Sequence, residues 1–336
     1  MARAPKKVKS SNASSLITAL QFISIAQKDK GSFFQTHCRI ANNQIVAYDG
    51  NLSAGHYVED ELTACPQTKV LKDALLKCGQ SLSITQLGNE RLAIKSDKFS
   101  VFVPCAVEEM PLVIPDSPVA PIDDRLKTGF EVVGLLAKEG AERVVLASVL
   151  LNANSMLGTN GHIVVEFWHG INLPPNLVLP KSFVTAILKT DKPLAQLGFS
   201  FNSETGQYNS LTFYFNDNSW IKTQLYNDQW PDTASMLNVD SNAMVLPESF
   251  FEAVKTLASL ASDNRFHLFQ NLLRTSFDET TGASYEVEGL PPGKIFSAEY
   301  LKLLCSFVTC IDFTTYNDKA LFFGENIRGA IMACRR

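Results

Sequence analysis

Apolar residues recur every three or four positions in six stretches of the chain, and they alternate with polar residues in much of the sequence between. The first spacing is typical of amphipathic helices, and the second is typical of half-buried strands. Helices are predicted over 14–27, 69–78, 125–139, 180–192, 247–262 and 297–309. Strands are predicted over 45–58 and 155–167, with hairpins over 91–103, 211–225 and 319–333.

These elements follow the same order three times: a helix, strands, a second helix and a closing hairpin. Met110-Pro111 and Trp230-Pro231 come after the first two hairpins and indicate linkers. A repeated order of this kind predicts three similar units of ordinary domain size. We therefore predict an α+β fold with three domains, each with two helices packed on antiparallel sheet. They cover 1–121, which includes a basic N-terminal tail, 122–240 and 241–336.

Two glycine-containing pairs interrupt the strands of the first two repeats. Asp49-Gly50 and Asn160-Gly161 are predicted as two-residue hairpin turns, since both residue types in each pair tolerate positive φ. The third repeat departs from this pattern because its central loop, 277–285, lacks such a pair.

Composition narrows the class of protein. Of 336 residues 46% are hydrophobic and 19% charged, and no apolar run reaches the roughly 20 residues of a membrane span. The basic start, Met1 to Lys9, is not followed by the apolar core of a secretory signal, so we expect a cytoplasmic protein. The seven cysteines are Cys38, Cys65, Cys78, Cys105, Cys305, Cys310 and Cys334, and no two of them form a CxxC pair. Most sit among apolar neighbours like small buried hydrophobes, so we expect no disulfide, zinc or other cofactor.

Short motifs carry a more specific resemblance. An Arg-x-x-Leu strand, Arg143 to Leu146, is followed by Gly-Thr-Asn-Gly-His at 158–162. This pair of motifs is similar to the second domain of the bacterial DNA sliding clamp, the beta subunit of DNA polymerase III, with Asn160 in place of the family's Asp. Four more segments resemble clamp motifs in the same order, so that the resemblance covers nearly the whole chain. They are 178–190, 229–232, 260–266 and 331–336. The short loops and basic start are compatible with a phage-encoded clamp.

The resemblance implies a processivity factor without catalytic activity of its own. Two chains would join head to tail into a homodimeric ring that encircles double-stranded DNA and slides without reading its sequence. A short linear peptide motif would tether DNA polymerase and the clamp loader to the ring. The resemblance also implies a dimer interface in which Lys77, Lys95 and Lys98 of one chain face the third domain of the other. The partner residues there are Leu260, Arg265, Phe266, Glu286 and Glu288.

The family's peptide pocket maps onto eight residues. It would comprise Leu146, Thr159, Gly161, His162 and Val164 of the second domain, with Met332, Ala333 and Cys334 of the tail. Ala333 and Cys334 stand where the family usually has Pro-Met, and Ile163 stands where it often has Arg, which leaves the partner motif open. Without the resemblance, Met332 and Cys334 indicate only core packing at a strand end.

Charge is distributed unevenly. The net charge is -4, and an acidic balance argues against a general nucleic-acid binder. The net charge of the predicted helix segments is +3 in the first repeat (14–30 and 69–78), +3 in the second (125–139 and 180–192) and -1 in the third (247–262 and 297–309). The total is +5, which leaves -9 for the rest of the chain. Basic helices suit an inner wall that faces phosphate. The predicted DNA-facing residues are Lys28, Lys30, Lys69, Lys72, Lys77, Lys127, Lys138, Lys181, Lys189 and Lys192.

The helix over 180–192 illustrates the charge argument. Lys181, Lys189 and Lys192 are predicted to share one face, opposite Phe183. The alternative is the charged, solvated face of any amphipathic helix.

Other functions fit the sequence less well. His162 next to Asn160 could indicate a hydrolase dyad, but GxSxG, HExxH, a phosphate-binding glycine loop and a DxD carboxylate pair are all missing. His37 and Cys38 are strand neighbours whose side chains should point to opposite faces. The remaining alternative is a monomeric peptide-binding adaptor with the clamp fold that does not encircle DNA.

Overall fold

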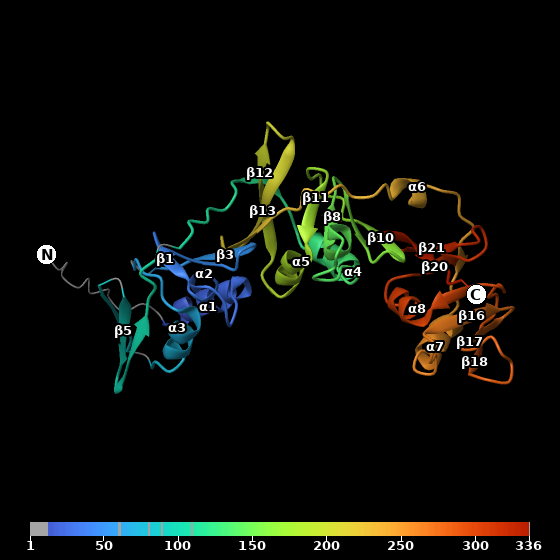
Figure 1. Ribbon diagram of the computed structural model, residues 1–336, viewed down its shortest axis with the longest axis horizontal. Helices are drawn as coiled ribbons and strands as arrows, with labels where there is room; N and C mark the ends of the chain where they lie inside the picture. The colour runs from blue at the N-terminus through green and yellow to red at the C-terminus, as the bar shows by residue number, and fades with distance from the viewer. Residues whose placement is uncertain (1–12, 60–61, 80, 89, 109, 336) are drawn as a thin grey trace. The chain divides into compact units, whose positions relative to one another are not determined.

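The computed structural model describes residues 13–59, 62–79, 81–88, 90–108 and 110–335 (Figure 1). The basic tail over Met1 to Lys9 therefore lies outside the described residues. The chain divides into two compact units, each assembled from two separate stretches. Unit 1 comprises Met1–Lys127 and Ser182–Asn227, and unit 2 comprises Thr128–Lys181 and Asp228–Arg336.

Unit 1 contains one large and one small antiparallel sheet. The large sheet has the order β1-β2-β3-β14-β13-β12-β7, and the small one has the order β4-β5-β6. The strands are β1 (Arg39–Ala41), β2 (Gln44–Tyr48), β3 (Leu52–Tyr57), β4 (Ser83–Leu87), β5 (Arg91–Ser96), β6 (Phe99–Pro104), β7 (Pro118–Pro121), β12 (Leu194–Asn202), β13 (Gln207–Phe215) and β14 (Trp220–Gln224). The helices are α1 (Ala13–Ile23), the 3-10 turn η1 (Ser24–Ala26), α2 (Phe33–Thr36) and α3 (Thr68–Leu75).

Unit 2 repeats this plan with a larger sheet. Its sheets have the orders β11-β8-β9-β10-β22-β21-β20-β15 and β18-β17-β16-β19. The strands are β8 (Ser148–Leu151), β9 (Ser155–Thr159), β10 (Ile163–Trp168), β11 (Leu177–Pro180), β15 (Met244–Val245), β16 (Arg265–Phe269), β17 (Leu272–Arg274), β18 (Ser284–Glu286), β19 (Ile295–Ser297), β20 (Cys310–Asp312), β21 (Lys319–Gly324) and β22 (Ile327–Met332). The helices are η2 (Val144–Ala147), α6 (Ala234–Leu237), α7 (Glu248–Leu257) and α8 (Ala298–Leu304). Two further helices, α4 (Arg125–Val133) and α5 (Lys181–Leu188), cross the boundaries between the units.

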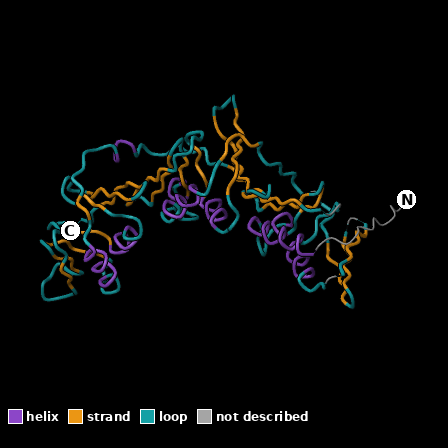
Figure 2. Tube along the Cα trace, turned by 180° about the vertical axis from the view of Figure 1, so that it is seen from behind, coloured by secondary structure: helices purple, strands orange, loops and turns teal. Residues whose placement is uncertain are grey.

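Each large sheet takes strands from two consecutive predicted repeats. In unit 1, β3 of the first repeat pairs with β14 of the second, and in unit 2, β10 pairs with β22. Within each unit the longer helices lie on one side of the large sheet, whereas the short helix α6 of unit 2 lies on the other side (Figure 2). The compact units therefore cut across the repeats, and the division into three domains stays a prediction.

The predicted helices exist, but several are shorter than the apolar spacing indicates. The helix predicted over 180–192 ends at Leu188, where the Thr190 hydroxyl accepts a hydrogen bond from the N–H of Lys192 (3.1 Å). Pro193 follows directly and cannot continue a helix. Lys189 and Lys192 thus lie beyond α5, and the predicted shared face of Lys181, Lys189 and Lys192 is wrong.

The two predicted turns form, but in a different way from the prediction. Only the glycines have positive φ, 113° at Gly50 and 89° at Gly161. Asp49 acts through its side chain instead: its Oδ1 accepts hydrogen bonds from the N–H groups of Asn51 (2.9 Å) and Leu52 (2.8 Å). The side-chain bonds organise a longer loop than the predicted two-residue turn.

A two-residue turn with positive φ at both positions does occur, at Asn42-Asn43 between β1 and β2. The sequence pattern does not predict this turn because neither of its two residues is glycine.

The cysteines are less buried than expected. All seven are free thiols, but only Cys38 is buried and the other six are half-buried. Burial raises the pKa of Cys38 to about 12 and that of Cys105 to about 11, so both are protonated at neutral pH. The expectation that most cysteines behave as buried hydrophobes is wrong for six of them.

Candidate partner-binding site and basic helix surfaces

The turn between β9 and β10 is fixed by side-chain hydrogen bonds. Asn160 Oδ1 accepts from the N–H groups of His162 (3.0 Å) and Ile163 (2.9 Å). The Thr159 hydroxyl donates to the carbonyl of Ile163 (2.7 Å) and accepts from the N–H of Gly161 (3.1 Å). Gly161 and His162 are consequently held at the surface, where both are exposed.

A hollow of about 480 Å³ lies beside this turn. Three predicted pocket residues, Leu146, Thr159 and Gly161, line it. The remaining lining residues are Arg143, Val145, Gln229, Trp230, Pro231 and Asp232. A hollow of this size with an apolar wall suits one or two side chains of an extended peptide.

The sheet brings the C-terminal tail next to the same turn. β10 pairs with β22, and the N–H of Met332 donates to the carbonyl of His162 (2.9 Å). Met332 is 51% exposed, and the ring of His162 stacks on Tyr300 with centroids 5.8 Å apart. The N–H groups of Ala333 and Cys334 donate to carbonyls of the third repeat. The tail therefore borders the turn, although Met332, Ala333 and Cys334 do not line the hollow.

Val164 belongs to the core instead of the predicted pocket. It is only 4% exposed and packs in a cluster with residues such as Leu150, Leu237 and Ala330. Val165 on the opposite face of β10 is also buried, because both faces of this strand are covered. We therefore leave Val164 out of the site.

Trp230 is the site residue that sequence reasoning missed. The sequence pattern indicates only a linker at this residue, but Trp230 lines the hollow and packs against the cluster around Val164. Its indole N–H is buried and has no hydrogen-bond partner among the described residues. A large aromatic residue in a linker was the available signal, because such a side chain rarely stays in solvent.

The predicted DNA-facing lysines fall into two groups. Lys28, Lys30, Lys69, Lys77, Lys138 and Lys189 are exposed, and Lys72 is half-buried. The other three, Lys127, Lys181 and Lys192, donate hydrogen bonds inside their own unit.

The three engaged lysines bind carbonyl or carboxylate oxygens. Lys127 Nζ donates to the carbonyls of Thr190 (3.0 Å) and Lys192 (2.5 Å), just beyond the end of α5. Lys181 Nζ donates to the carbonyl of Gly134, just beyond the end of α4, and burial lowers its pKa. Cations at the ends of helices are favoured by the helix dipole.

Lys192 is held by three groups. Its Nζ lies 2.5 Å from Asp217 Oδ2 and 3.2 Å from the hydroxyl of Ser219, and it sits 4.3 Å from the ring centroid of Phe22. Together with Lys127 and Lys181, this lysine contributes to local structure.

Most residues of the predicted dimer interface are accessible. Lys77, Lys95 and Lys98 are exposed in unit 1. In unit 2, Leu260, Glu286 and Glu288 are exposed and Arg265 is half-buried. Phe266 is fully buried in the core of its own unit, so its side chain cannot meet a partner, and we leave it out of the proposed interface.

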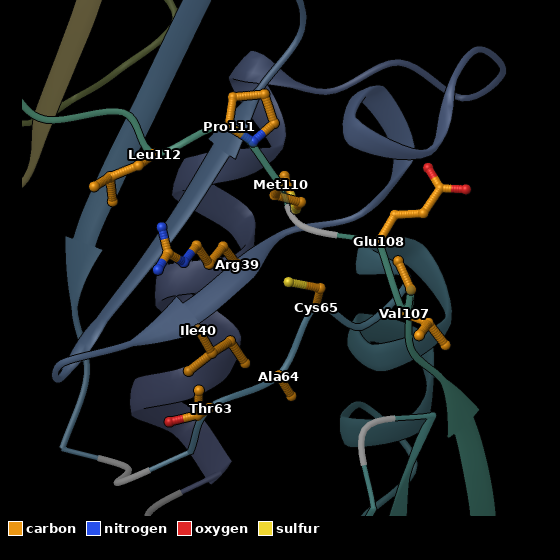
Figure 3. A pocket seen from close by; sticks show the side chains of 11 residues that line it. Arg39, Ile40, Thr63, Ala64, Cys65, Val107, Glu108, Met110, Pro111 and Leu112 are labelled. Atoms are coloured by element: carbon orange, nitrogen blue, oxygen red, sulfur yellow. The ribbon is translucent and has the colours of Figure 1, made fainter.

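A second hollow, of about 620 Å³, lies in unit 1 and contains none of the predicted site residues. Arg39 and Leu112 stand on one side of it, and Val107 and Glu108 on the other (Figure 3). The Cys65 thiol points into it, with a pKa raised by burial. Its walls come from β1 and from the linker that follows β6.

In the described part of the chain, no group of three or more His, Cys, Asp or Glu side chains could hold a metal ion. Among these same residues no helix has the length and hydropathy to cross a membrane.

Comparison with solved structures identifies the fold. The chain superposes on the DNA polymerase III subunit beta of Pseudomonas aeruginosa with a TM-score of 0.77 at 14% identity, covering 99% of both chains. The beta sliding clamp of Caulobacter crescentus gives 0.80 at 13% identity, covering 99% of this chain and 100% of the other. The beta clamp of Helicobacter pylori bound to a DNA ligase peptide gives 0.73 at 17% identity, covering 98% and 100%. No protein-family model and no curated protein matches the sequence.

The chain thus has the fold of a bacterial beta sliding clamp along its whole length. The predicted α+β fold and the resemblance to these clamps are confirmed.

Proposed function

We propose that this chain is a DNA sliding clamp: a homodimeric ring that encircles duplex DNA and tethers partners through a short peptide motif. The observation that carries the proposal is the match to clamp structures over 98–99% of this chain and 99–100% of theirs. Fold alone does not fix function, so the site must supply the rest of the argument.

The hollow beside the β9–β10 turn supports partner binding. It joins an apolar wall, Leu146 and Trp230, to an exposed backbone turn at Gly161. Met332 and His162 lie at the same turn and extend the surface toward the C-terminus. The clamp of Helicobacter pylori was solved with a DNA ligase peptide, and we propose peptide recognition of that kind for this chain.

The ring itself is proposed from the fold and from surface charge. A head-to-tail contact would place Lys77, Lys95 and Lys98 against Leu260, Arg265, Glu286 and Glu288 of a second chain, which pairs basic with acidic surface. Such a protein works in the cytoplasm as a scaffold without catalysis. The second candidate is a monomeric adaptor that keeps the peptide site but does not encircle DNA.

Peptide binding is tested most sharply at Trp230. The Trp230→Ala variant removes one wall of the hollow, and loss of an anchor contact typically costs about 2 kcal/mol, roughly 30-fold in Kd. The measurement is a titration of the labelled DNA ligase peptide by fluorescence anisotropy. The matched control is Trp168→Ala, since Trp168 is 37% exposed on β10 in the same unit and lies outside the hollow.

Unchanged affinity in a folded Trp230→Ala chain would show that the pocket lies elsewhere. Deletion of Met332 to Arg336 is a second variant, expected to abolish binding of the peptide and of the polymerase. It also removes backbone hydrogen bonds to His162, Asp318 and Ile295, so it requires a melting control. The mass in solution separates the two candidates, because the clamp must be a dimer and the adaptor a monomer.

A further inference from the structure

The helices of the first and second predicted repeats look alike in sequence. The segments 14–30 and 69–78 together carry a net charge of +3, and so do the segments 125–139 and 180–192. Sequence alone therefore assigns equal attraction for phosphate to the two repeats. Their side chains distinguish them.

In the second repeat, three lysines are already bound. Lys127 and Lys181 donate to the carbonyls at helix ends, and Lys192 is paired with Asp217. Only 14% of the Lys127 side chain and 25% of the Lys192 side chain are exposed. A phosphate would have to compete with these oxygens for each ammonium, which reduces the gain from binding it. These three charges equal the whole net charge of the repeat's helix segments.

In the first repeat Lys28, Lys30 and Lys69 are exposed and Lys72 is half-buried. Lys69, at the start of α3, has its Nζ 3.7 Å from Asp29 Oδ1, so the loop carrying Lys28 and Lys30 lies beside this helix. The Lys69 and Asp29 side chains are 69% and 88% exposed, and such loose surface pairs contribute little to stability. Lys28, Lys30 and Lys72 form no ion pair with other described residues.

The position of Lys69 is not explained by helix stability. It is the second residue of α3, near the positive end of the helix dipole, where a cation is unfavourable. The preceding residue, Gln67, provides no side-chain cap. Phosphate, the anion that a DNA-encircling chain meets, would offset this cost.

We propose that phosphate contact is concentrated on the first-repeat patch, defined as Lys28, Lys30, Lys69 and Lys72, whereas Lys127, Lys181 and Lys192 serve the structure of the second repeat. This inference rests on the proposed encirclement of DNA. The contact along the ring wall would then be strong at each first repeat and weaker at each second.

Two matched triple variants of the full chain test the proposal. One is K28Q/K69Q/K72Q in the patch, and the other is K127Q/K181Q/K192Q in the second repeat. Each removes three positive charges, so long-range effects of net charge are equal. Binding to a short fluorescein-labelled duplex is measured by anisotropy at several salt concentrations, and thermal melting is recorded in parallel.

The patch triple should lower the slope of log affinity against log salt by about 1 for each lysine that contacts phosphate, with unchanged melting. The second-repeat triple should keep the wild-type slope and melt at a lower temperature. If that triple does not fold, the single variants Lys181→Met and Lys192→Gln replace it, with the same expectation.

Equal loss of slope in both triples, or loss in the second-repeat variants alone, would overturn the proposal while leaving DNA encirclement intact. A wild-type dimer without salt-dependent DNA binding would overturn the proposed function, and this proposal with it.

Discussion

The first-repeat and second-repeat helix segments carry the same net charge, but their lysine side chains make different contacts. The first-repeat patch presents its ammonium groups to solvent, whereas Lys127, Lys181 and Lys192 use theirs on the carbonyls at helix ends and on Asp217. A positive count along a helix is therefore not a measure of a phosphate-binding surface. A lysine is available to phosphate only when its ammonium group is not already bound to an oxygen of the same chain.

The largest expected effect is on the packing of the second-repeat helix α4 against strand β9. A Cβ added at Gly158 on β9 would lie 2.3 Å from the carbonyl oxygen of Val133, the last residue of α4. Because a backbone atom is in the way, Gly158→Ala should destabilise the chain by about 3 kcal/mol. Urea unfolding measures this, with Ser100→Ala on exposed β6 as a control. A change below about 0.5 kcal/mol at Gly158 would mean that α4 is not fixed on the sheet.

A smaller effect is expected from the lysine that binds the end of α4. Lys181→Met keeps most of the side-chain stem but leaves the carbonyl of Gly134 without this donor, at a cost of about 1–2 kcal/mol. The exposed Lys189→Met should change stability by less than about 0.5 kcal/mol. Both values come from the same unfolding experiment. If the two lysines gave equal values, the distinction between engaged and free lysines would fail.

The smallest expected effect depends on pH. Burial alone would raise the pKa of Asp217, but hydrogen bonds from Lys192 and Ser219 outweigh it and lower the pKa from 3.8 to about 2. Because the folded pKa lies below the unfolded one, the resulting stability is fully present above about pH 4 and is lost as pH falls toward 2. Because Asp217 is 44% exposed, solvent screening reduces the contribution of its lowered pKa to the free energy of unfolding to about 1 kcal/mol.

Lys192→Gln should remove most of that pH dependence. The measurement is the free energy of unfolding at pH 6 and at pH 3 for both proteins, where the variant should lose about 0.5 kcal/mol less than wild type on acidification. An identical loss in the two proteins would show that Lys192 does not hold Asp217 in its charged form.

The sequence predicts much of the fold because apolar spacing reflects which face of each element is buried. All six predicted helices occur, and the three closing hairpins occur as β5–β6, β13–β14 and β21–β22. Helix ends are less predictable because they depend on local bonds, such as that between Thr190 and Lys192. The pairing of β3 with β14 and of β10 with β22 follows from long-range packing that no local pattern indicates.

Less of the candidate site could be predicted. The turn at Thr159 to His162 is encoded locally, by a short polar side chain before a glycine, and it forms as a surface feature beside the hollow. Val164 and Phe266 belong to the core because neighbouring elements cover both faces of their strands. The fate of Lys127 could not be predicted, since its acceptor carbonyls lie 63 and 65 residues further along the chain.

The central claim, that the chain encircles DNA, is tested most directly by topology. The clamp is loaded on a nicked circular plasmid by a clamp loader or by spontaneous ring opening, and co-elution is followed by gel filtration at high salt, where phosphate contacts are weak. We predict that the protein co-elutes with the circle and is released when a restriction enzyme linearises it, because a ring slides off free ends. Equal retention on circular and linear DNA, or no retention on either, would contradict the account.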